Sequence, residues 1–410
     1  MIGVEVTKVS SPRLYDSQDL YDFLGVPKII NAAGTYTLFG GSRMRETTIA
    51  VMAQAARSFV EIPVLMRRAN DYLARITNNE AAFITSGAAA GLYLSTLACM
   101  INKGRVPIDV CWDLEKVANC EAIIHRAHRN AYDWSIVQTG VKLVEIGWPS
   151  VMFEVGFPNE FKTSVNKTIG ELKARINENT IAIFYTAGLG MDEGGWVPPG
   201  AAEFETVLAI AKEHDIPVVV DAAAQLPPVE NLWAFTKAGA DIVLFSGGKD
   251  LRGPQSAGLM VGRKDLLDTL YEIGNPNHGP GRMFKVGREE IAAMVAAVDY
   301  FVHMDHDARL AWCEEQIEQL KRAFHNNAKI SIETSFPNEA GQPIPRALVK
   351  IHGIDGKKLV QILYNQTPKI AVTPAPDGIF VNPMTMEEGE IEIVVQSLQR
   401  ILDSDSPCST

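Results

Sequence analysis

The sequence predicts an α/β protein built on a mainly parallel seven-stranded sheet with helices on both faces, followed by a smaller C-terminal α+β domain. Short runs of apolar, β-branched residues recur through the middle of the chain, and most are apolar nearly throughout, as in strands covered on both faces. Helix-like stretches opened by proline or glycine separate most of these runs, which is typical of a doubly wound sheet.

The elements follow from this pattern in order. The seven expected strands cover residues 81–85, 121–125, 142–146, 181–185, 216–221, 241–245 and 257–262. Helices are expected at 171–179 and 201–215, and a helical repeat predicts a long helix at 287–304 that leaves the sheet domain. In the smaller domain we expect strands near 328–334, 346–352, 368–372 and 378–381, and helices near 355–364 and 388–402.

These elements suggest four segments. We expect an N-terminal segment with interface helices at 1–70, a large α/β domain at 71–283, a small α+β domain at 284–402 and a disordered tail at 403–410.

Composition limits the classes of function. The net charge of −11 argues against a nucleic-acid-binding surface, which needs an excess of Lys and Arg. The five cysteines show no CxxC spacing, which favours reduced thiols in the cytoplasm over disulfides or a zinc site. Neither a secretion signal nor a run of about 18 apolar residues is found, so we expect no membrane partner and no bound metal.

Ligands of open α/β sheets bind beyond the carboxyl ends of the strands, so the residues at those ends matter most. The first such motif is ITSGAAAG, in which a strand stops at Ser86 and Gly87 and an Ala-rich helix begins. The free backbone N–H groups at Gly87, Ala88 and Ala89 suit a phosphate. The alternative is that the small residues only let this helix pack closely on the sheet.

The second motif is VVVDAAAQLPP, where Asp221 ends an apolar strand and Ala223 leaves a flat apolar surface beside it. A carboxylate there requires a cation or N–H partner, although it could instead cap the following turn. The third motif is SGGKDLRGPQ, with Lys249 after two glycines. It fails as a Walker A loop because Asp250 stands where Ser or Thr is required.

Together the three motifs provide what pyridoxal phosphate needs. The cofactor requires a phosphate anchor, a carboxylate for its pyridine nitrogen and an amine for a Schiff base. In this order they resemble fold-type I pyridoxal-phosphate enzymes, and more narrowly the selenocysteine-synthase-like group and its D-glucosaminate-6-phosphate ammonia-lyase branch. The segments INAAGTYTLFGGSRM, HRAHRNAYDWSI and HGPGRMFKVGREEI are similar to that branch, so the resemblance spans roughly residues 25–400.

The resemblance implies roles for individual residues. Lys249 would form the Schiff base, Asp221 would pair with the pyridine nitrogen, and Ser86, Gly87, Ala88 and Ala89 would hold the phosphate with Ser246. A side chain after the cradle would cover the ring, for which His128 is preferred over His125. Thr186 either approaches the cofactor's phenolic oxygen or caps a turn.

Small anionic substrates need cations, and Arg282 and Lys285 are candidates because an Arg fork matches a carboxylate, although both could be surface residues. Tyr36 and Arg43 could also enter the site. The resemblance implies a homodimer or higher homo-oligomer with shared sites, and a small-molecule amino acid substrate.

The expected reaction is α,β-elimination from a hydroxylated amino acid or amino sugar acid, giving a 2-keto acid and ammonia. The same motifs would also serve a racemase, an aldolase or an aminotransferase. A non-catalytic relative that only binds the cofactor is a further alternative. Selenium transfer is not expected, because the acidic chain lacks a basic module for tRNA.

Overall fold

The computed structural model describes residues 14, 17–104, 106–110, 114–117, 119–147, 158–187 and 201–404. The expected tail beyond residue 404 and the cysteines Cys111 and Cys408 lie outside these ranges. The contacts among described residues divide the chain into two compact units. One contains residues 34–317 and 334–346, and the other contains residues 1–33, 318–333 and 347–410.

A seven-stranded sheet forms the centre of the first unit, and its strand order is β2-β8-β7-β6-β5-β3-β4. Only β8 runs antiparallel to its neighbours, so the expected mainly parallel sheet is confirmed. The strands are β2 (Ala81–Thr85), β3 (Glu121–His125), β4 (Lys142–Ile146), β5 (Thr180–Thr186), β6 (Val218–Asp221), β7 (Ile242–Ser246) and β8 (Gly258–Gly262).

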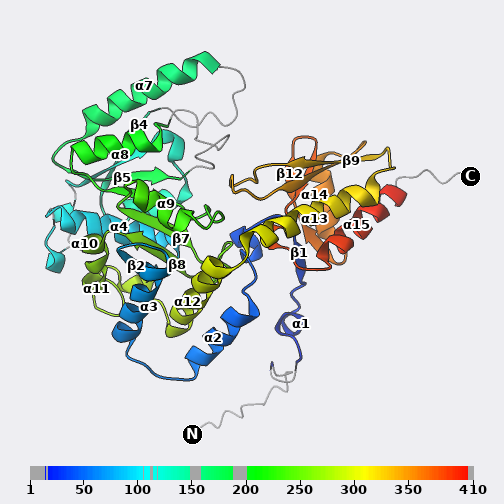
Figure 1. Ribbon diagram of the computed structural model, residues 1–410, viewed down its shortest axis with the longest axis horizontal. Helices are drawn as coiled ribbons and strands as arrows, with labels where there is room; N and C mark the ends of the chain where they lie inside the picture. Colours follow the sequence, from blue (N-terminus) through cyan, green and yellow to red (C-terminus); the bar gives the residue numbers. More distant parts are fainter. Residues whose placement is uncertain are drawn as a thin grey trace, which may run out of the picture. The chain divides into compact units, whose positions relative to one another are not determined.

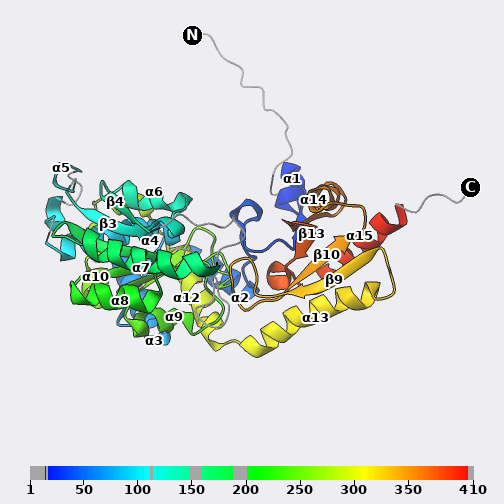
Figure 2. The ribbon, with the colours of Figure 1, turned by 90° about the horizontal axis from the view of Figure 1, so that it is seen from above.

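Helices cover both faces of this sheet. Gly91 of α4 lies against Leu244, whereas Tyr185, whose side chain points to the other face, packs on Phe204 of α8. Figure 2 shows α7 beside α8, in agreement with their contacts. The helices are α4 (Ala88–Asn102), α5 (Leu114–Val117), α6 (Trp134–Val137), α7 (Pro158–Arg175), α8 (Phe204–Glu213), α9 (Asn231–Ala238), α10 (Lys264–Asp268) and α11 (Leu270–Ile273).

Helices from distant parts of the sequence pack together in this unit. The long helix α12 (Arg288–His303) lies beside α2 (Glu46–Ala56) and α3 (Ile62–Ile76) (Figure 1). Its buried side is apolar, and it begins and ends within a residue of the expected range. These contacts keep α12 with the sheet, so the chain does not divide at the expected boundary near residue 283.

The second unit contains two small sheets. A parallel pair joins β1 (Ile29–Asn31) to β11 (Lys369–Ala371), which places the N-terminal strand with the C-terminal part of the chain. The other sheet has the order β12-β13-β10-β9. Its strands are β9 (Ile330–Ser335), β10 (Arg346–Ile351), β12 (Thr373–Ala375) and β13 (Gly378–Val381), and the helices that complete the chain are α1 (Leu20–Leu24), α13 (His306–Phe324), α14 (Gly356–Asn365) and α15 (Glu390–Ser404).

Several expected elements differ from the structure. The helix expected at 171–179 ends at Arg175, because Asn177 accepts a hydrogen bond from the N–H of Asn179 at 2.8 Å and forms a turn before β5. The sequence pattern also did not predict α13 as a separate helix or β12 as a strand.

Candidate active site

The reversed strand β8 brings the ends of separate motifs together. Its first residue, Gly258, pairs with Thr85 at the end of β2 and with Ser246 at the end of β7. Asp221, which ends β6, pairs with Leu244 of β7. Neighbouring strands lie about 4.8 Å apart, so the residues that follow these strand ends lie side by side at the same end of the sheet's strands.

The first motif leaves the start of α4 open. Gly87 is the N-cap with φ 111°, and among the described residues no side chain caps the helix there. A Cβ at Gly87 would meet no atom within 4 Å. Close packing also occurs in this motif, because a Cβ at Gly91 would lie 3.0 Å from Leu244 and a Cβ at Gly258 would lie 2.7 Å from the backbone of Gly87. Residues 86–89 are partly exposed, so the N–H groups of this turn can reach an anion.

Asp221 is held by the turn that follows it. Its Oδ1 accepts a hydrogen bond from the N–H of Ala223 at 3.0 Å, which is the capping contact given above as the alternative role. A carboxylate has a second oxygen, so this contact is compatible with pairing to a pyridine N–H. Burial raises the pKa of Asp221, while the Ala223 hydrogen bond and the charge of Lys249 act in the opposite direction.

Lys249 lies close enough to Asp221 for their charges to interact. Burial lowers the pKa of the Lys249 amine, and the charge of Asp221 opposes that shift. The neutral amine is the form that attacks an aldehyde, so a lowered pKa favours attachment of a carbonyl compound. The amine is only partly exposed, unlike a surface lysine in a glycine-rich turn.

Two buried histidines lie at the end of β3: His125 is its last residue, and His128 ends the 3-10 turn that follows (Arg126–His128). His128 Nδ1 accepts a hydrogen bond from the N–H of Thr186 at 3.3 Å, which leaves Nε2 to carry the proton of the neutral ring. Thr186 pairs with Asp221 where β5 and β6 end, so this hydrogen bond places His128 near that end of the strands. The His128 Nε2 atom and both ring nitrogens of His125 have no hydrogen-bond partner among described residues.

Both histidine rings are neutral at physiological pH. Burial lowers the pKa of His128 well below its usual range and that of His125 to about 4. The two rings lie 4.9 Å apart, and Tyr185 contacts both of them edge-on. A neutral ring near the end of these strands can stack on an aromatic ligand, as the prediction for His128 requires.

The structure places the predicted substrate residues on separate segments of the chain. Arg282 begins a short 3-10 helix (Arg282–Phe284) whose Phe284 packs on Tyr93 of α4 with ring centroids 4.9 Å apart. Lys285, which follows it, is exposed. This segment is therefore fixed to the middle of α4, and the assignment of Arg282 and Lys285 to the substrate stays a prediction.

The N-terminal candidates have different neighbours. Tyr36 interacts electrostatically with Glu339 and with the buried guanidinium of Arg346, and burial raises the pKa of its phenol. Arg346 forms an ion pair with Glu339 at 3.2 Å. Arg43 is exposed, and its carbonyl accepts a hydrogen bond from Arg252, three residues after Lys249.

No sequence pattern indicated Arg346, because a single arginine at the start of strand β10 has no distinctive spacing. The same is true of Ser42, whose side chain contacts the backbone of Lys249.

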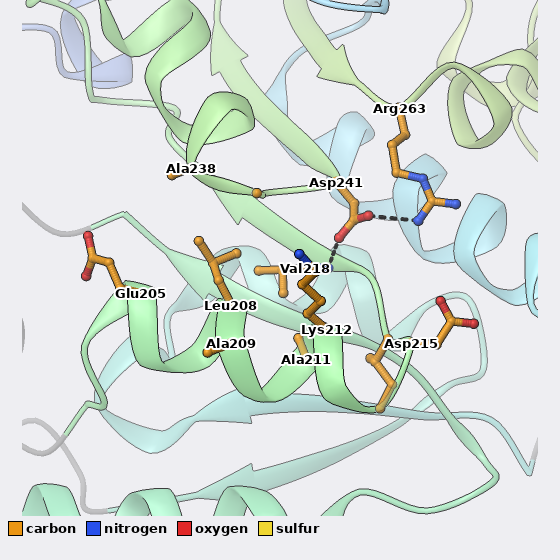
Figure 3. Close-up of a pocket in the computed structure, with 12 residues that line it drawn as sticks. Glu205, Leu208, Ala209, Ala211, Lys212, Asp215, Val218, Ala238, Asp241 and Arg263 are labelled. Carbon is orange, nitrogen blue, oxygen red and sulfur yellow. Dashed lines mark hydrogen bonds and ion pairs between the residues drawn. The ribbon is translucent and has the colours of Figure 1, made fainter.

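A separate groove of about 520 Å³ lies at the opposite end of the strands (Figure 3). Val218 and Asp241 line it at the starts of β6 and β7. Asp241 accepts hydrogen bonds from the Val218 N–H and from Arg263, both at 2.8 Å. The charges of Asp241 and Arg263 thus already stabilise the starts of these strands. The groove therefore takes no part in the candidate active site.

Comparison with known families identifies the chain. A model of the aminotransferase class-V family matches residues 160–379. The chain belongs to the aminotransferase class-V family. Pyridoxal 5'-phosphate is the cofactor of this family, and the site fits it in two respects. An uncapped helix start with open space suits the phosphate, and a buried carboxylate that interacts with a lysine suits the ring and its aldehyde.

One relative matches nearly the full length of this chain. D-glucosaminate-6-phosphate ammonia lyase of Salmonella typhimurium (strain 14028s / SGSC 2262) is 27% identical over 398 residues, which cover 94% of this chain and 98% of the relative. A solved structure of D-glucosaminate-6-phosphate ammonia-lyase has a TM-score of 0.76 and 25% identity over 95% of this chain and 99% of its own. The expected fold-type I architecture and the resemblance are thereby confirmed.

Other relatives are named for different activities. A 5'-C-glycyluridine monooxygenase-decarboxylase of a Streptomyces species is 27% identical and covers 81% of this chain and 77% of its own. An L-seryl-tRNA(Sec) selenium transferase of Carboxydothermus hydrogenoformans (strain ATCC BAA-161 / DSM 6008 / Z-2901) is 24% identical and covers 70% and 67%. The similarity to the selenocysteine-synthase-like group is thus confirmed, and the relatives' named activities differ from one another.

Proposed function

We propose that this aminotransferase class-V protein is a pyridoxal-phosphate-dependent ammonia-lyase. Its substrate would be a hydroxylated amino acid or an amino sugar acid similar to D-glucosaminate, with or without a phosphate. The observation that carries the proposal is the electrostatic pairing of Lys249 with Asp221 beside an open helix start, in a chain that matches a named ammonia lyase over 94% of its length.

The cofactor, when bound, supplies a ring that stores the electron pair released from the substrate Cα. Lys249 would hold the cofactor through its amine, and the same amine would take and hold the proton from the substrate Cα. Asp221 would keep the pyridine nitrogen protonated by accepting a hydrogen bond from its N–H. The raised pKa of Asp221 describes the site without that cation, whose charge would lower it again.

The remaining predicted residues hold the cofactor in this proposal. The turn at Ser86, Gly87, Ala88 and Ala89 would bind the phosphate together with Ser246, and His128 and Ala223 would contact the ring. Thr186, whose N–H donates to His128, would approach the phenolic oxygen of the cofactor.

Elimination removes the Cα proton and the β-hydroxyl as water, and hydrolysis of the resulting enamine consumes one water and releases ammonia and a 2-keto acid. Screening purified protein against D- and L-hydroxy amino acids and amino sugar acids for ammonia and keto acid tests this. Ammonia with a keto acid supports elimination. Amino acid of the opposite hand would indicate a racemase, a carbonyl fragment an aldolase, and amino transfer to a keto acid an aminotransferase.

Several residues are candidates for binding the substrate in this proposal. Arg282, Lys285, Tyr36 and Arg43 are candidates for the substrate's anionic groups. Arg346 joins this set because its buried guanidinium interacts with Tyr36 and Glu339. Loss of activity with unchanged cofactor content on substituting one of them would identify the residue.

We also propose that the protein is a homo-oligomer. Phe59 is 95% exposed and Leu38 is 84% exposed, and Val60 and Val64 near Phe59 are half exposed. Apolar side chains this open near one another are typical of surfaces that another chain covers. Light scattering after gel filtration measures the assembly. A cytoplasmic location is consistent with the buried cysteine thiols at Cys99, Cys120 and Cys313.

Within the described residues, no helix is long and apolar enough to span a membrane.

A further inference from the structure

The backbone around Lys249 is held by a segment that lies far away in the sequence. We call residues 247–253 the lysine loop and residues 41–45 the strap. Ser42 contacts the loop through its backbone and its side chain: its N–H donates to the carbonyl of Gly248 at 3.0 Å, and its hydroxyl lies 2.6 Å from the carbonyl oxygen of Lys249 itself. These contacts join positions that are 206 and 207 residues apart.

The hydroxyl of Ser42 has one proton, so it can donate fully to one acceptor only. It also lies 3.0 Å from the Gly248 carbonyl, but the Ser42 N–H already donates there. The shorter distance, to the Lys249 carbonyl, therefore marks the main hydroxyl hydrogen bond.

Glycines allow the strap to approach the loop this closely. Gly41 has φ 70°, and a Cβ there would lie 2.4 Å from the carbonyl oxygen of Gly248 and 2.2 Å from Gln255 Oε1. A Cβ on Gly248 would lie 2.0 Å from the same Gln255 atom. Both glycines are thus required by contact between protein segments, rather than by an approach of the backbone to the cofactor ring.

Further contacts fasten the residues that follow Lys249. Arg45 donates to the carbonyl of Leu251 at 2.7 Å, and Arg252 donates to the carbonyl of Arg43 at 2.8 Å. Asp250 is buried and pairs with Arg309 at 3.2 Å. Each residue from 248 to 252 therefore receives a contact from the strap or from α13.

The loop also contains a backbone conformation that needs such support. Arg252 has φ 54°, in the left-handed region that costs a non-glycine residue about 1 kcal/mol or more. Its N–H donates to the carbonyl of Lys249 at 2.9 Å, so the carbonyl that binds Ser42 also closes this turn. The Ser42 hydroxyl thus acts on the peptide unit that determines where the lysine side chain starts.

We propose that Ser42 is a positioning residue for Lys249. Its hydroxyl fixes the Lys249 peptide, so that the amine moves between the cofactor and the substrate Cα by rotation of its own side chain alone. Reacting groups must be placed to within a fraction of an ångström, and a displacement of about 1 Å can cost about a hundredfold in rate. This inference rests on the proposed role of Lys249.

The test compares Ser42→Ala and Ser42→Thr with Ser58→Ala, an exposed serine in the same N-terminal region that serves as the matched control. In cofactor-free protein we would measure how fast Lys249 is trapped by pyridoxal phosphate and cyanoborohydride, as a function of pH, by mass spectrometry. We expect Ser42→Ala to slow trapping about tenfold or more across the pH range, Ser42→Thr to restore it, and Ser58→Ala to leave it unchanged.

A substrate found in the ammonia screen adds a second measurement. We expect Ser42→Ala to lower kcat about tenfold to a hundredfold with little change in KM, while the thermal unfolding midpoint stays near that of Ser58→Ala. Wild-type trapping rates in Ser42→Ala would overturn the positioning role. So would an equal loss in Ser42→Thr. Trapping needs no substrate, so absence of any lyase activity would contradict the proposed function without affecting this test.

Discussion

Asp221 and Lys249 favour each other's charged forms, although burial acts against both charges. Burial is the larger effect for each residue, so without cofactor the pKa of the carboxyl is raised and that of the amine is lowered. A cationic pyridine nitrogen would neutralise the carboxylate, and an aldehyde would consume the amine. The pair is therefore arranged for a ligand that satisfies both groups at once.

The first prediction concerns covalent attachment. Lys249→Ala should abolish the cofactor adduct that borohydride reduction leaves on the peptide containing residue 249, and should lower activity about a thousandfold. Mass spectrometry of digested protein locates the adduct. Lys264→Ala, which changes an exposed lysine, is the control and should behave as wild type. An adduct that persists in Lys249→Ala would show that another amine carries the cofactor.

The second prediction concerns the acidity of the substrate. Asp221→Ala and Asp221→Asn should retain measurable cofactor but exchange the Cα proton about a hundredfold more slowly, because the pyridine nitrogen loses the carboxylate that keeps it protonated. Proton NMR in D₂O follows this exchange directly. Exchange at the wild-type rate in both variants would remove Asp221 from its assigned role.

The third prediction is a dependence of stability on pH in cofactor-free protein. Because the folded pKa of Lys249 lies below its unfolded value of about 10.5, the unfolded state binds more protons between these two pKa values. Wild type should therefore gain stability relative to Lys249→Met as pH rises through this window. Denaturant unfolding at a series of pH values measures the difference. Lys264→Met should show no such gain, since Asp268 raises the pKa of Lys264.

The fourth prediction separates the two histidines. His128→Ala should weaken cofactor binding about tenfold, because it removes an aromatic face. His128→Phe keeps that face and should recover most of the affinity. His125→Ala should lower the unfolding midpoint more than it lowers cofactor affinity, since His125 is fully buried. The opposite pattern in cofactor titrations would assign the ring contact to His125.

The fifth prediction tests the phosphate cradle. Gly87 and Gly104 both have positive φ, and a Cβ at either would meet no atom within 4 Å. Gly104 has φ 67°, as in the left-handed region, where alanine costs about 1 kcal/mol, whereas Gly87, with φ 111° and ψ 162°, lies in a region that essentially only glycine adopts, so alanine should cost more there, about 1–3 kcal/mol. Only Gly87→Ala should weaken cofactor binding, because its methyl group enters the space before α4. Equal cofactor affinities in the two variants would place the phosphate elsewhere.

Much of the sheet could be predicted because its strands are buried on both faces. The strands at 81–85, 121–125 and 142–146 match the predicted ranges residue for residue. The reversed direction of β8 could not be predicted in this way, because a strand that is apolar throughout reads the same in either direction. The direction matters, since it places Gly258 beside Thr85 and Ser246.

The candidate site was predictable where a strand end carries its own signal. Lys249, Asp221 and Gly87 each stand out within a few residues of local sequence. Ser42 and Arg45 do not, because their importance comes from hydrogen bonds to a loop more than 200 residues away. Arg309 lies on α13, a helix that the sequence pattern did not predict, and so its pairing with Asp250 was missed as well.

The pairing of β8 with both β2 and β7 also restricts where residues can be inserted or deleted. The stretch between Ser246 and Gly258 has both ends fixed in register and contacts the strap along its length. An inserted or deleted residue there would displace the lysine relative to the phosphate turn. The turn around Gly239 lies between α9 and β7, at the opposite end of the strands. Among the described residues, a Cβ added at Gly239 would come within 4 Å of the Leu208 side chain alone. Length variation during evolution, or peptide tags added by design, should therefore be tolerated at residue 239 and rejected between 246 and 258.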